Sequence, residues 1–180
     1  SLVGLIGLAI GSFLNVVIHR LPRGGSVISP ASQCPHCHYV LRAADNIPVL
    51  SYLVLGGRCR NCRAPISPRY PIVELVTALI FIGHYLAFGW TALLAIRLVF
   101  AAAMIALFAI DLEHHLLPDR ITLPGIAAGL AASLFFPPGL RDAVIGVLAG
   151  GGVLWLIGEA YFRYSKWRTG EGEEGMGGGD

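Results

Sequence analysis

Long apolar runs separated by short polar connections dominate the pattern of this chain. Because an α-helix rises about 1.5 Å per residue, roughly 17–25 apolar residues are needed to cross the hydrocarbon core of a bilayer. Several runs reach or approach that length. The pattern therefore predicts a polytopic, all-α integral membrane bundle, with spans over residues 2–18, 72–88, 93–110, 121–136 and 143–162.

Two of these spans depart from the simple pattern. The first begins at Ser1 with no leading polar residue, as if it were truncated. A cleaved secretory signal is the alternative, but no small-residue cleavage site follows the run, and a basic segment does. Pro124 interrupts the fourth span, although membrane helices tolerate proline. Both are kept as predicted crossings.

The composition excludes an ordinary soluble domain. Hydrophobic residues make up 55% of the chain and charged residues only 13%, with a mean hydropathy of +0.68. Soluble domains carry about 25% charged residues. The long apolar runs are therefore read as membrane spans rather than as core helices.

Basic residues give the predicted bundle its orientation, because an excess of Lys and Arg marks cytoplasmic loops. The connection between the first two spans has one acid, Asp45, against seven arginines: Arg20, Arg23, Arg42, Arg58, Arg60, Arg63 and Arg69. The turn around Trp90 carries no charge, which suits the outer face. The fifth span ends in a second basic group, Arg163, Lys166 and Arg168.

If the basic connection between the first two spans is cytoplasmic, counting the crossings that follow it places two aspartates on the same side of the membrane. Asp111 ends the third span, and Asp180 follows the fifth span as the last residue of the sequence. Both are predicted at the cytoplasmic face. This parity argument requires the fourth span to be a real crossing.

All four cysteines lie in the cytoplasmic loop, as Cys34-x-x-Cys37 and Cys59-x-x-Cys62, with 21 residues between the pairs. Two such pairs provide four thiolates for a closed, tetrahedral zinc site, and such a site stabilises a small unit that lacks a core. Two disulfides or four free thiols are the alternatives, and the cytoplasm disfavours disulfides. His36 and His38 could replace a cysteine, but the set is complete without them.

Asp111 and Asp180 also suggest chemistry, because two carboxylates that share a proton can hydrolyse an amide without a metal. Each has a simpler interpretation: Asp111 can end a helix, and Asp180 can belong to a frayed tail. Asp119 is a rival for the first position or, alternatively, the N-cap of the next helix. Glu74 lies inside a span, where ionisable residues are expensive, and could line the site.

The ordered set of motifs closely resembles the type IV prepilin peptidase family of membrane aspartic peptidases with a Gly-x-Gly-Asp motif. The resemblance covers essentially the whole chain. Besides the cysteine pairs, it rests on Gly11-Ser12-Phe13-Leu14-Asn15, His19-Arg20-Leu21-Pro22, Asn46-Ile47-Pro48, Gly57-Arg58-Cys59-Arg60, Pro65-Ile66-Ser67-Pro68-Arg69-Tyr70-Pro71, Glu74-Leu75, Ile110-Asp111-Leu112-Glu113-His114-His115-Leu116-Leu117-Pro118-Asp119 and Gly175-Met176-Gly177-Gly178-Gly179-Asp180.

The resemblance implies that Asp111 and Asp180 are the catalytic residues and that Cys34, Cys37, Cys59 and Cys62 are the zinc ligands. It also implies cleavage of the leader peptide of type IV prepilins and pilin-like secretion proteins, followed by methylation of the new amino terminus with S-adenosylmethionine. The family continues beyond this aspartate with a lysine two residues on and further spans. This sequence ends at Asp180, so we expect it to be incomplete.

The expected organisation has four parts. Residues 1–18 form the first span, and 19–71 form an inserted cytoplasmic zinc-knuckle loop. Residues 72–162 form four spans with Asp111 at a cytoplasmic end, and 163–180 form a cytoplasmic glycine-rich segment. The expected location is the bacterial inner membrane, multi-pass, with the active site facing the cytoplasm. The expected partners are type IV prepilin and pseudopilin precursors and membrane lipid, with no nucleic acid.

Two other function classes fit parts of the pattern. A metal transporter would use cysteines, histidines and acids, but the thiols lie in a loop and the spans lack a line of ligands at the midplane. A structural protein of a secretion machine could use the zinc loop to dock partners.

Overall fold

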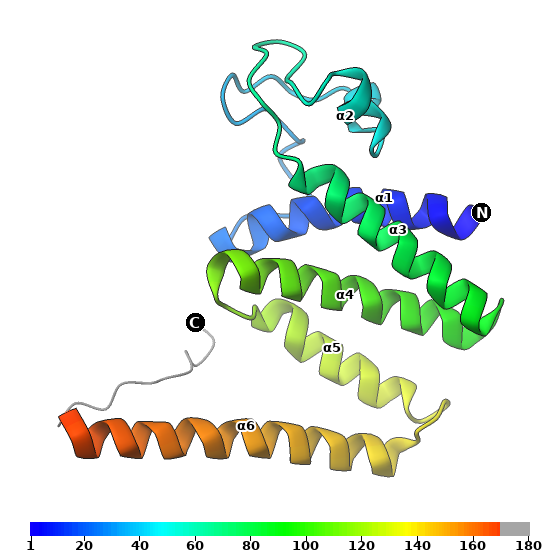
Figure 1. The fold of residues 1–180 in the computed structure, drawn as a ribbon. Helices are drawn as coiled ribbons and strands as arrows, with labels where there is room; N and C mark the ends of the chain where they lie inside the picture. The colour runs from blue at the N-terminus through cyan, green and yellow to red at the C-terminus, as the bar shows by residue number, and fades with distance from the viewer. Residues whose placement is uncertain (170–180) are drawn as a thin grey trace. The chain divides into compact units, whose positions relative to one another are not determined.

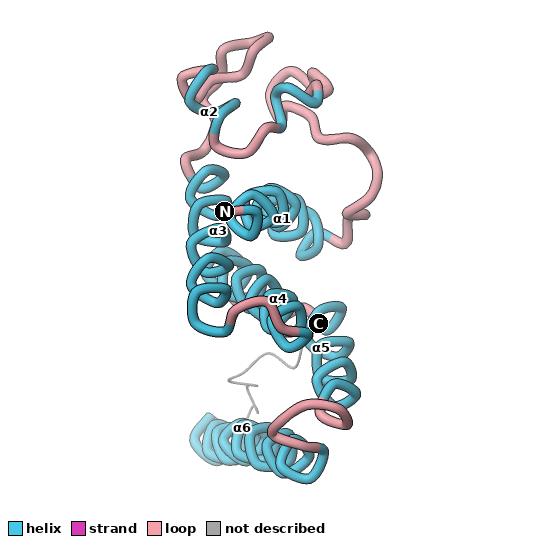
Figure 2. Tube along the Cα trace, turned by 90° about the vertical axis from the view of Figure 1, so that its right-hand side faces the viewer, coloured by secondary structure: helices cyan, strands magenta, loops and turns pink. Residues whose placement is uncertain are grey.

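The computed structural model describes residues 1–169 and divides the chain into two compact units, Ser1–His115 and a second unit that begins at Leu116. The first unit contains α1 (Leu2–Arg20), the 3-10 turns η1 (Leu21–Arg23) and η2 (Ala43–Asn46), α2 (Leu50–Val54), α3 (Arg69–Phe88) and α4 (Ala92–His114). The second contains α5 (Asp119–Ala132) and α6 (Leu140–Thr169), which contact each other. The described residues form helices and loops without a strand (Figure 2).

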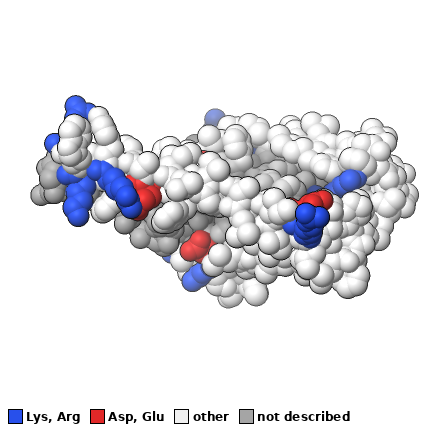
Figure 3. Space-filling view, turned by 90° about the horizontal axis from the view of Figure 1, so that it is seen from below, with Lys and Arg blue, Asp and Glu red and all other residues white. Residues whose placement is uncertain are grey.

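Four helical segments are long and apolar enough to cross a membrane: Leu2–Arg23, Arg69–Phe88, Ala92–His114 and Leu140–Arg168. Their outward side chains are apolar, as Leu86, Val99 and Phe108 show with exposed fractions of 76%, 72% and 67%. Charged side chains gather in a few small groups and leave most of the visible surface uncharged (Figure 3). Such apolar surface is suited to lipid rather than to water. The predicted all-α membrane bundle with an inserted cysteine loop is confirmed.

The predicted fourth span, 121–136, does not reach crossing length. Helix α5 begins at Asp119 and ends at Ala132, so its 14 residues extend about 21 Å, short of a hydrocarbon core of about 30 Å. The chain turns after Ser133, before a Pro137-Pro138 pair that cannot continue a helix. A crossing by this segment, and the parity that depends on it, therefore stay predictions. Pro118, rather than Asp119, is the N-cap residue of α5.

Helices α1 and α3 cross at very close range (Figure 1). A Cβ atom added to Gly7 would lie 2.6 Å from the Cα of Ala78, and one added to Gly11 would lie 2.6 Å from the Cα of Glu74. Small residues let membrane helices approach until their backbones touch, because lipid provides no hydrophobic force that drives helices together. The two glycines therefore fix where α1 and α3 meet.

Helix α4 completes the first unit by packing against both α1 and α3. Its inner side buries Leu94, Ala106 and Ile110, which are 2%, 1% and 0% exposed. Thr91 caps its start by accepting a hydrogen bond from the Leu94 backbone N–H at 3.2 Å. His115 ends it in a left-handed conformation.

Because α1 and α3 approach so closely, a Gly→Ala substitution should change the unfolding free energy differently at Gly11 and at Gly83. Gly11→Ala places a methyl group against the α3 backbone, which cannot yield without separating the helices, so we expect a loss of about 1–3 kcal/mol of unfolding free energy. Gly83→Ala, on α3 with open space around its Cβ position, is the matched control and should be neutral or slightly stabilising. Reversible unfolding in mixed detergent micelles measures both. Equal stability of the two variants would contradict this crossing.

Candidate functional site

The four cysteines form one cluster in the loop. Their sulfur atoms all lie within 4.8 Å of one another, with Sγ–Sγ distances of 3.8 Å for Cys34–Cys62 and 3.9 Å for Cys37–Cys59. Four thiolates arranged tetrahedrally at about 2.3 Å from a metal ion stand about 3.8 Å apart. All four are free thiols, and His36 and His38 are outside the described cluster. The donor set and its spacing therefore fit a closed metal site.

The two cysteine pairs share one backbone pattern, which the sequence reading did not identify as a repeat. In the first pair, Cys34 donates its N–H to the Tyr39 carbonyl at 2.9 Å and accepts from the His38 N–H at 3.0 Å. In the second pair, Cys59 donates to the Ala64 carbonyl at 2.8 Å and accepts from the Arg63 N–H at 3.1 Å. The shared signal is Cys-x-x-Cys followed by a residue with positive φ.

Backbone N–H groups around the cluster favour the thiolate form. A hydrogen bond from the Tyr39 backbone lowers the pKa of Cys37 to about 6. Hydrogen bonds from the backbones of Cys62 and Asn61 likewise lower the pKa of Cys59. Because a metal binds the thiolate and not the thiol, these N–H groups favour coordination. Burial and the neighbouring cysteine sulfurs act the other way on Cys62 and raise its pKa to about 11.

Asp45, the single acid of the loop, holds the two pairs together. Its carboxylate accepts from Arg60 Nε at 2.7 Å, from the Arg42 N–H at 3.3 Å and from the Tyr39 hydroxyl at 3.5 Å. Its side chain is 1% exposed. The hydrogen bond from Arg60 is the main cause that lowers the pKa of Asp45. The stability it contributes is therefore complete above an ordinary carboxyl pKa and is lost only as the pH falls through the lowered value.

One hydrogen bond joins the loop to α3, and a second joins α1 to the start of α3. The Val49 N–H donates to Glu74 Oε2 at 2.7 Å, and Asn15 Nδ2 donates to the Tyr70 carbonyl at 3.0 Å. Glu74 and Asn15 are 7% and 2% exposed. The sequence reading singled out Glu74 because it is an ionisable residue in a span. It quoted Asn15 within a family motif but gave it no role, although Asn15 is also a buried polar residue in an apolar run.

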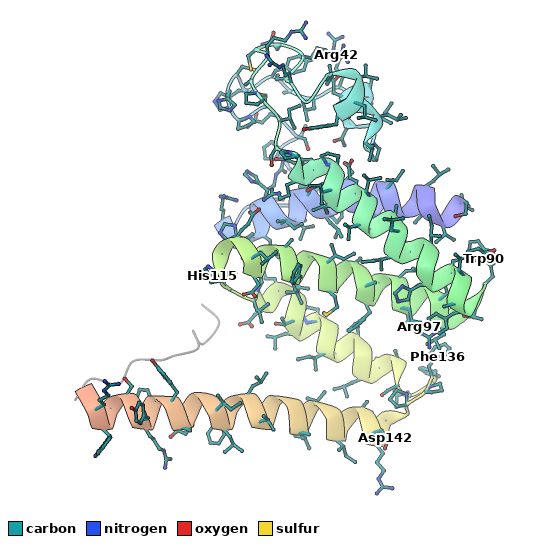
Figure 4. All side chains as sticks on the ribbon, viewed as in Figure 1. Arg42, Trp90, Arg97, His115, Phe136 and Asp142 are labelled. Carbon is teal, nitrogen blue, oxygen red and sulfur yellow. The ribbon has the colours of Figure 1, made fainter. Side chains whose placement is uncertain are left out.

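The end of α4 that carries Asp111 lies on the same side of the first unit as the loop. Arg69, at the start of α3, forms an ion pair with Glu113, two residues after Asp111. Figure 4 places His115 at this end of α4 and Trp90 and Arg97 at the other. The loop and the end of α4 that carries Asp111 therefore lie on one side of the first unit, and the assignment of that side to the cytoplasm stays a prediction.

Asp111 itself is exposed in the last turn of α4. Its backbone carbonyl accepts the His115 N–H at 2.9 Å, while its carboxylate forms no hydrogen bond or ion pair within residues 1–169. Asp119, the rival, begins α5 and accepts from the Thr122 hydroxyl at 3.5 Å. Asp180 lies outside the described residues, so its pairing with Asp111 stays a prediction.

In comparisons with known proteins, each half of the chain matches a family model. A family model described as the bacterial peptidase A24 N-terminal domain matches residues 5–88, and one described as the type IV leader peptidase family matches residues 98–180. No solved structure matches the chain.

Several relatives carry the name prepilin leader peptidase/N-methyltransferase. Those from Myxococcus xanthus and Aeromonas hydrophila are each 44% identical, over 98% and 100% of this chain, and the one from Pseudomonas aeruginosa is 38% identical over 98%. The chain spans 51% of the length of the Myxococcus relative, 69% of the Aeromonas relative and 67% of the Pseudomonas relative.

Proposed function

The chain belongs to the type IV leader peptidase family, and from that premise we propose that it acts as a membrane aspartic endopeptidase. The proposed substrates are the leader peptides of type IV prepilins and pilin-like secretion proteins. The observation that carries the proposal is the exposed Asp111 carboxyl at the end of a membrane helix, beside the arginine-rich loop. A peptide bond just outside the lipid would lie at that level.

We assign Asp111 and Asp180 as the catalytic pair. One carboxylate activates a water molecule, and the other, protonated, polarises the scissile carbonyl and later protonates the leaving amine. Two carboxyls held close share one proton because like charges raise one pKa, so the pair titrates as a unit. The exposed side chain of Asp111 leaves room for water and for an extended peptide.

Arginine placement supports a cytoplasmic site in the bacterial inner membrane. The loop joins α1 to α3 on the side of Asp111 and carries the basic excess that stays in the cytoplasm. The chain is a multi-pass membrane protein, with four helices of crossing length in the described part. A precursor held in the same bilayer by its apolar segment would present its basic leader at this face.

We further propose N-methylation of the product, as the names of the relatives indicate for those proteins. Cleavage releases an α-amino group with a pKa of about 8, which is partly neutral in the cytoplasm. S-adenosylmethionine, when bound, would supply the methyl group for this amine.

We propose zinc as the ion of the cysteine cluster, with a structural role. Four thiolates complete its tetrahedral shell and leave no open position for substrate. The loop has few apolar core residues, so metal binding supplies folding energy. Cys34 and Cys59 are buried at 7% and 4% exposure, which suits the centre of a folded unit.

Replacing either catalytic carboxyl should abolish cleavage. In the full-length protein, Asp111→Asn and Asp180→Asn are each expected to slow cleavage of a pilin-type precursor in proteoliposomes by at least ~100-fold, since acid–base groups contribute about 10²–10⁴. Asp119→Asn tests the rival, and Asp142→Asn, an exposed acid at the start of α6, is the control. Retained cleavage by both Asp111→Asn and Asp180→Asn would end the peptidase assignment.

Metal analysis tests the cluster separately from catalysis. The purified protein should contain one zinc ion per chain, and Cys34→Ser with Cys59→Ser should lose it and expose the loop to limited proteolysis. His36→Ala with His38→Ala is the matched control and should keep full zinc content. If the protein is metal-free and its cysteines are paired in disulfides, the zinc proposal is wrong. The peptidase assignment does not depend on that result.

A further inference from the structure

The short helix α2 gives the loop an exposed apolar patch. Ile47, Leu50, Leu53 and Val54 are 46%, 60%, 66% and 81% exposed, and we call these four residues the α2 patch. Leu50, Leu53 and Val54 follow one another at the i, i+3 and i+4 spacing of one helix face, and Ile47 precedes Leu50 by about one turn. The sequence from residue 46 to residue 57 has no charged side chain. Such a patch marks a surface that contacts another protein or lipid.

The opposite face of α2 is turned toward the membrane helices. Ser51, Tyr52 and Leu55 line a cavity of about 830 Å³, which Ser12 of α1 and Glu74 of α3 line from the other side. None of the four residues of the α2 patch is among the described lining residues. The patch therefore faces away from the protein within the first unit.

A hydrogen bond fixes the level of α2 along the spans. The Val49 N–H, directly before α2, donates to Glu74 Oε2 at 2.7 Å. Glu74 follows Arg69, the first residue of α3, by five positions, which is about 7.5 Å along the helix. Its Cα lies against Gly11, nine positions or about 13.5 Å from Arg20 at the loop-side end of α1. Figure 2 views α1 end-on, and Figure 1 places α2 over the middle of α1 rather than beyond its loop-side end.

The surface of α3 at this level is suited to lipid. Ile72, Leu75 and Val76, on either side of Glu74 in the sequence, are 54%, 46% and 41% exposed, and α3 has membrane-crossing length. Exposed apolar side chains on a spanning helix contact acyl chains. A bilayer that surrounds α3 at the level of Glu74 therefore also reaches α2.

The backbone around α2 is compatible with lipid, where an N–H group without an acceptor is costly. The N–H groups of Leu53, Leu55, Gly56 and Gly57 donate to carbonyls of the same segment at 2.9–3.1 Å. The N–H of Val49, which has no acceptor in the segment, is the one bonded to Glu74. The local hydrogen bonds thus leave apolar side chains as the outer surface of α2.

We propose that α2 anchors the loop in the bilayer, with the α2 patch inserted among the acyl chains of the leaflet on the loop side. Interfacial helices bury their apolar face about 5–10 Å into the boundary between headgroups and acyl chains. The level of Val49 favours lipid as the occupant, because a partner from the water phase would meet the patch only beyond the ends of the spans. Arg58, which follows the uncharged run, suits the phosphates of the headgroups. The inference does not depend on the peptidase or methyltransferase assignment.

Photo-crosslinking of the full-length protein in nanodiscs tests the anchor. The nanodiscs contain phosphatidylcholine with tritium in its acyl chains, and a diazirine-bearing residue replaces Leu53 or Val54. Leu79, exposed in the middle of α3, is the positive control. Arg42, on the side of the loop away from the helices (Figure 4), is the negative control. Irradiation should transfer label to the two patch positions about as efficiently as to Leu79 and at least ~10-fold more than to Arg42, because acyl chains surround inserted side chains.

The other outcomes identify a different neighbour of the α2 patch. Labelling at Leu79 with only background labelling at Leu53 and Val54 would show that the patch lies in water. A crosslink from Leu53 to a second copy of the chain would assign the patch to a dimer interface. A crosslink to another segment of the same chain would assign it to internal packing. Each of these three results, in variants whose gel-filtration profile matches the wild type, would overturn the proposed anchor.

Discussion

The crossing of α1 and α3 at Gly7 and Gly11 is the constraint on which the rest of the first unit depends. Backbone contact is possible there because neither glycine carries a Cβ atom. Helices in lipid gain little from burying apolar surface against each other, so such close contact replaces the hydrophobic effect as the source of cohesion. Because the loop leaves from α1 and returns into α3, this crossing also fixes the distance between its two ends. Near this crossing, Asn15 of α1 binds the Tyr70 carbonyl at the start of α3, and Glu74 of α3 binds the Val49 N–H of the loop.

The loop must be stabilised in a different way, because it has few apolar residues to bury. Four thiols and the Asp45–Arg60 ion pair replace a core, and both connect segments that are distant along the chain. A metal ion at the cysteines would stabilise the loop strongly. The loop then forms one wall of a cavity whose other wall is formed by α1 and α3.

Features encoded locally could be predicted from the sequence, and features set by long-range contacts could not. Apolar runs long enough to cross a bilayer and paired Cys-x-x-Cys motifs are local, so the bundle and the cysteine cluster were predicted. The end of α5 at Ala132 was missed, because hydrophobicity continues to Phe136 beyond the last helical turn. The roles of Gly11, Asn15 and Asp45 depend on which residues face them across the fold, and no spacing rule indicates that. Asp180 was assigned by resemblance, and its geometry lies outside the described residues.

The central claim is that Asp111 and Asp180 lie at one cytoplasmic face, and sidedness labelling tests it most directly. An azide-bearing residue is placed at position 112, at 179 or, as a control, at 90, and is reacted with a membrane-impermeant cyclooctyne. The account predicts that position 90 reacts in intact spheroplasts, and that positions 112 and 179 react only after permeabilisation. Labelling of 112 and 179 from opposite sides of the membrane would contradict it.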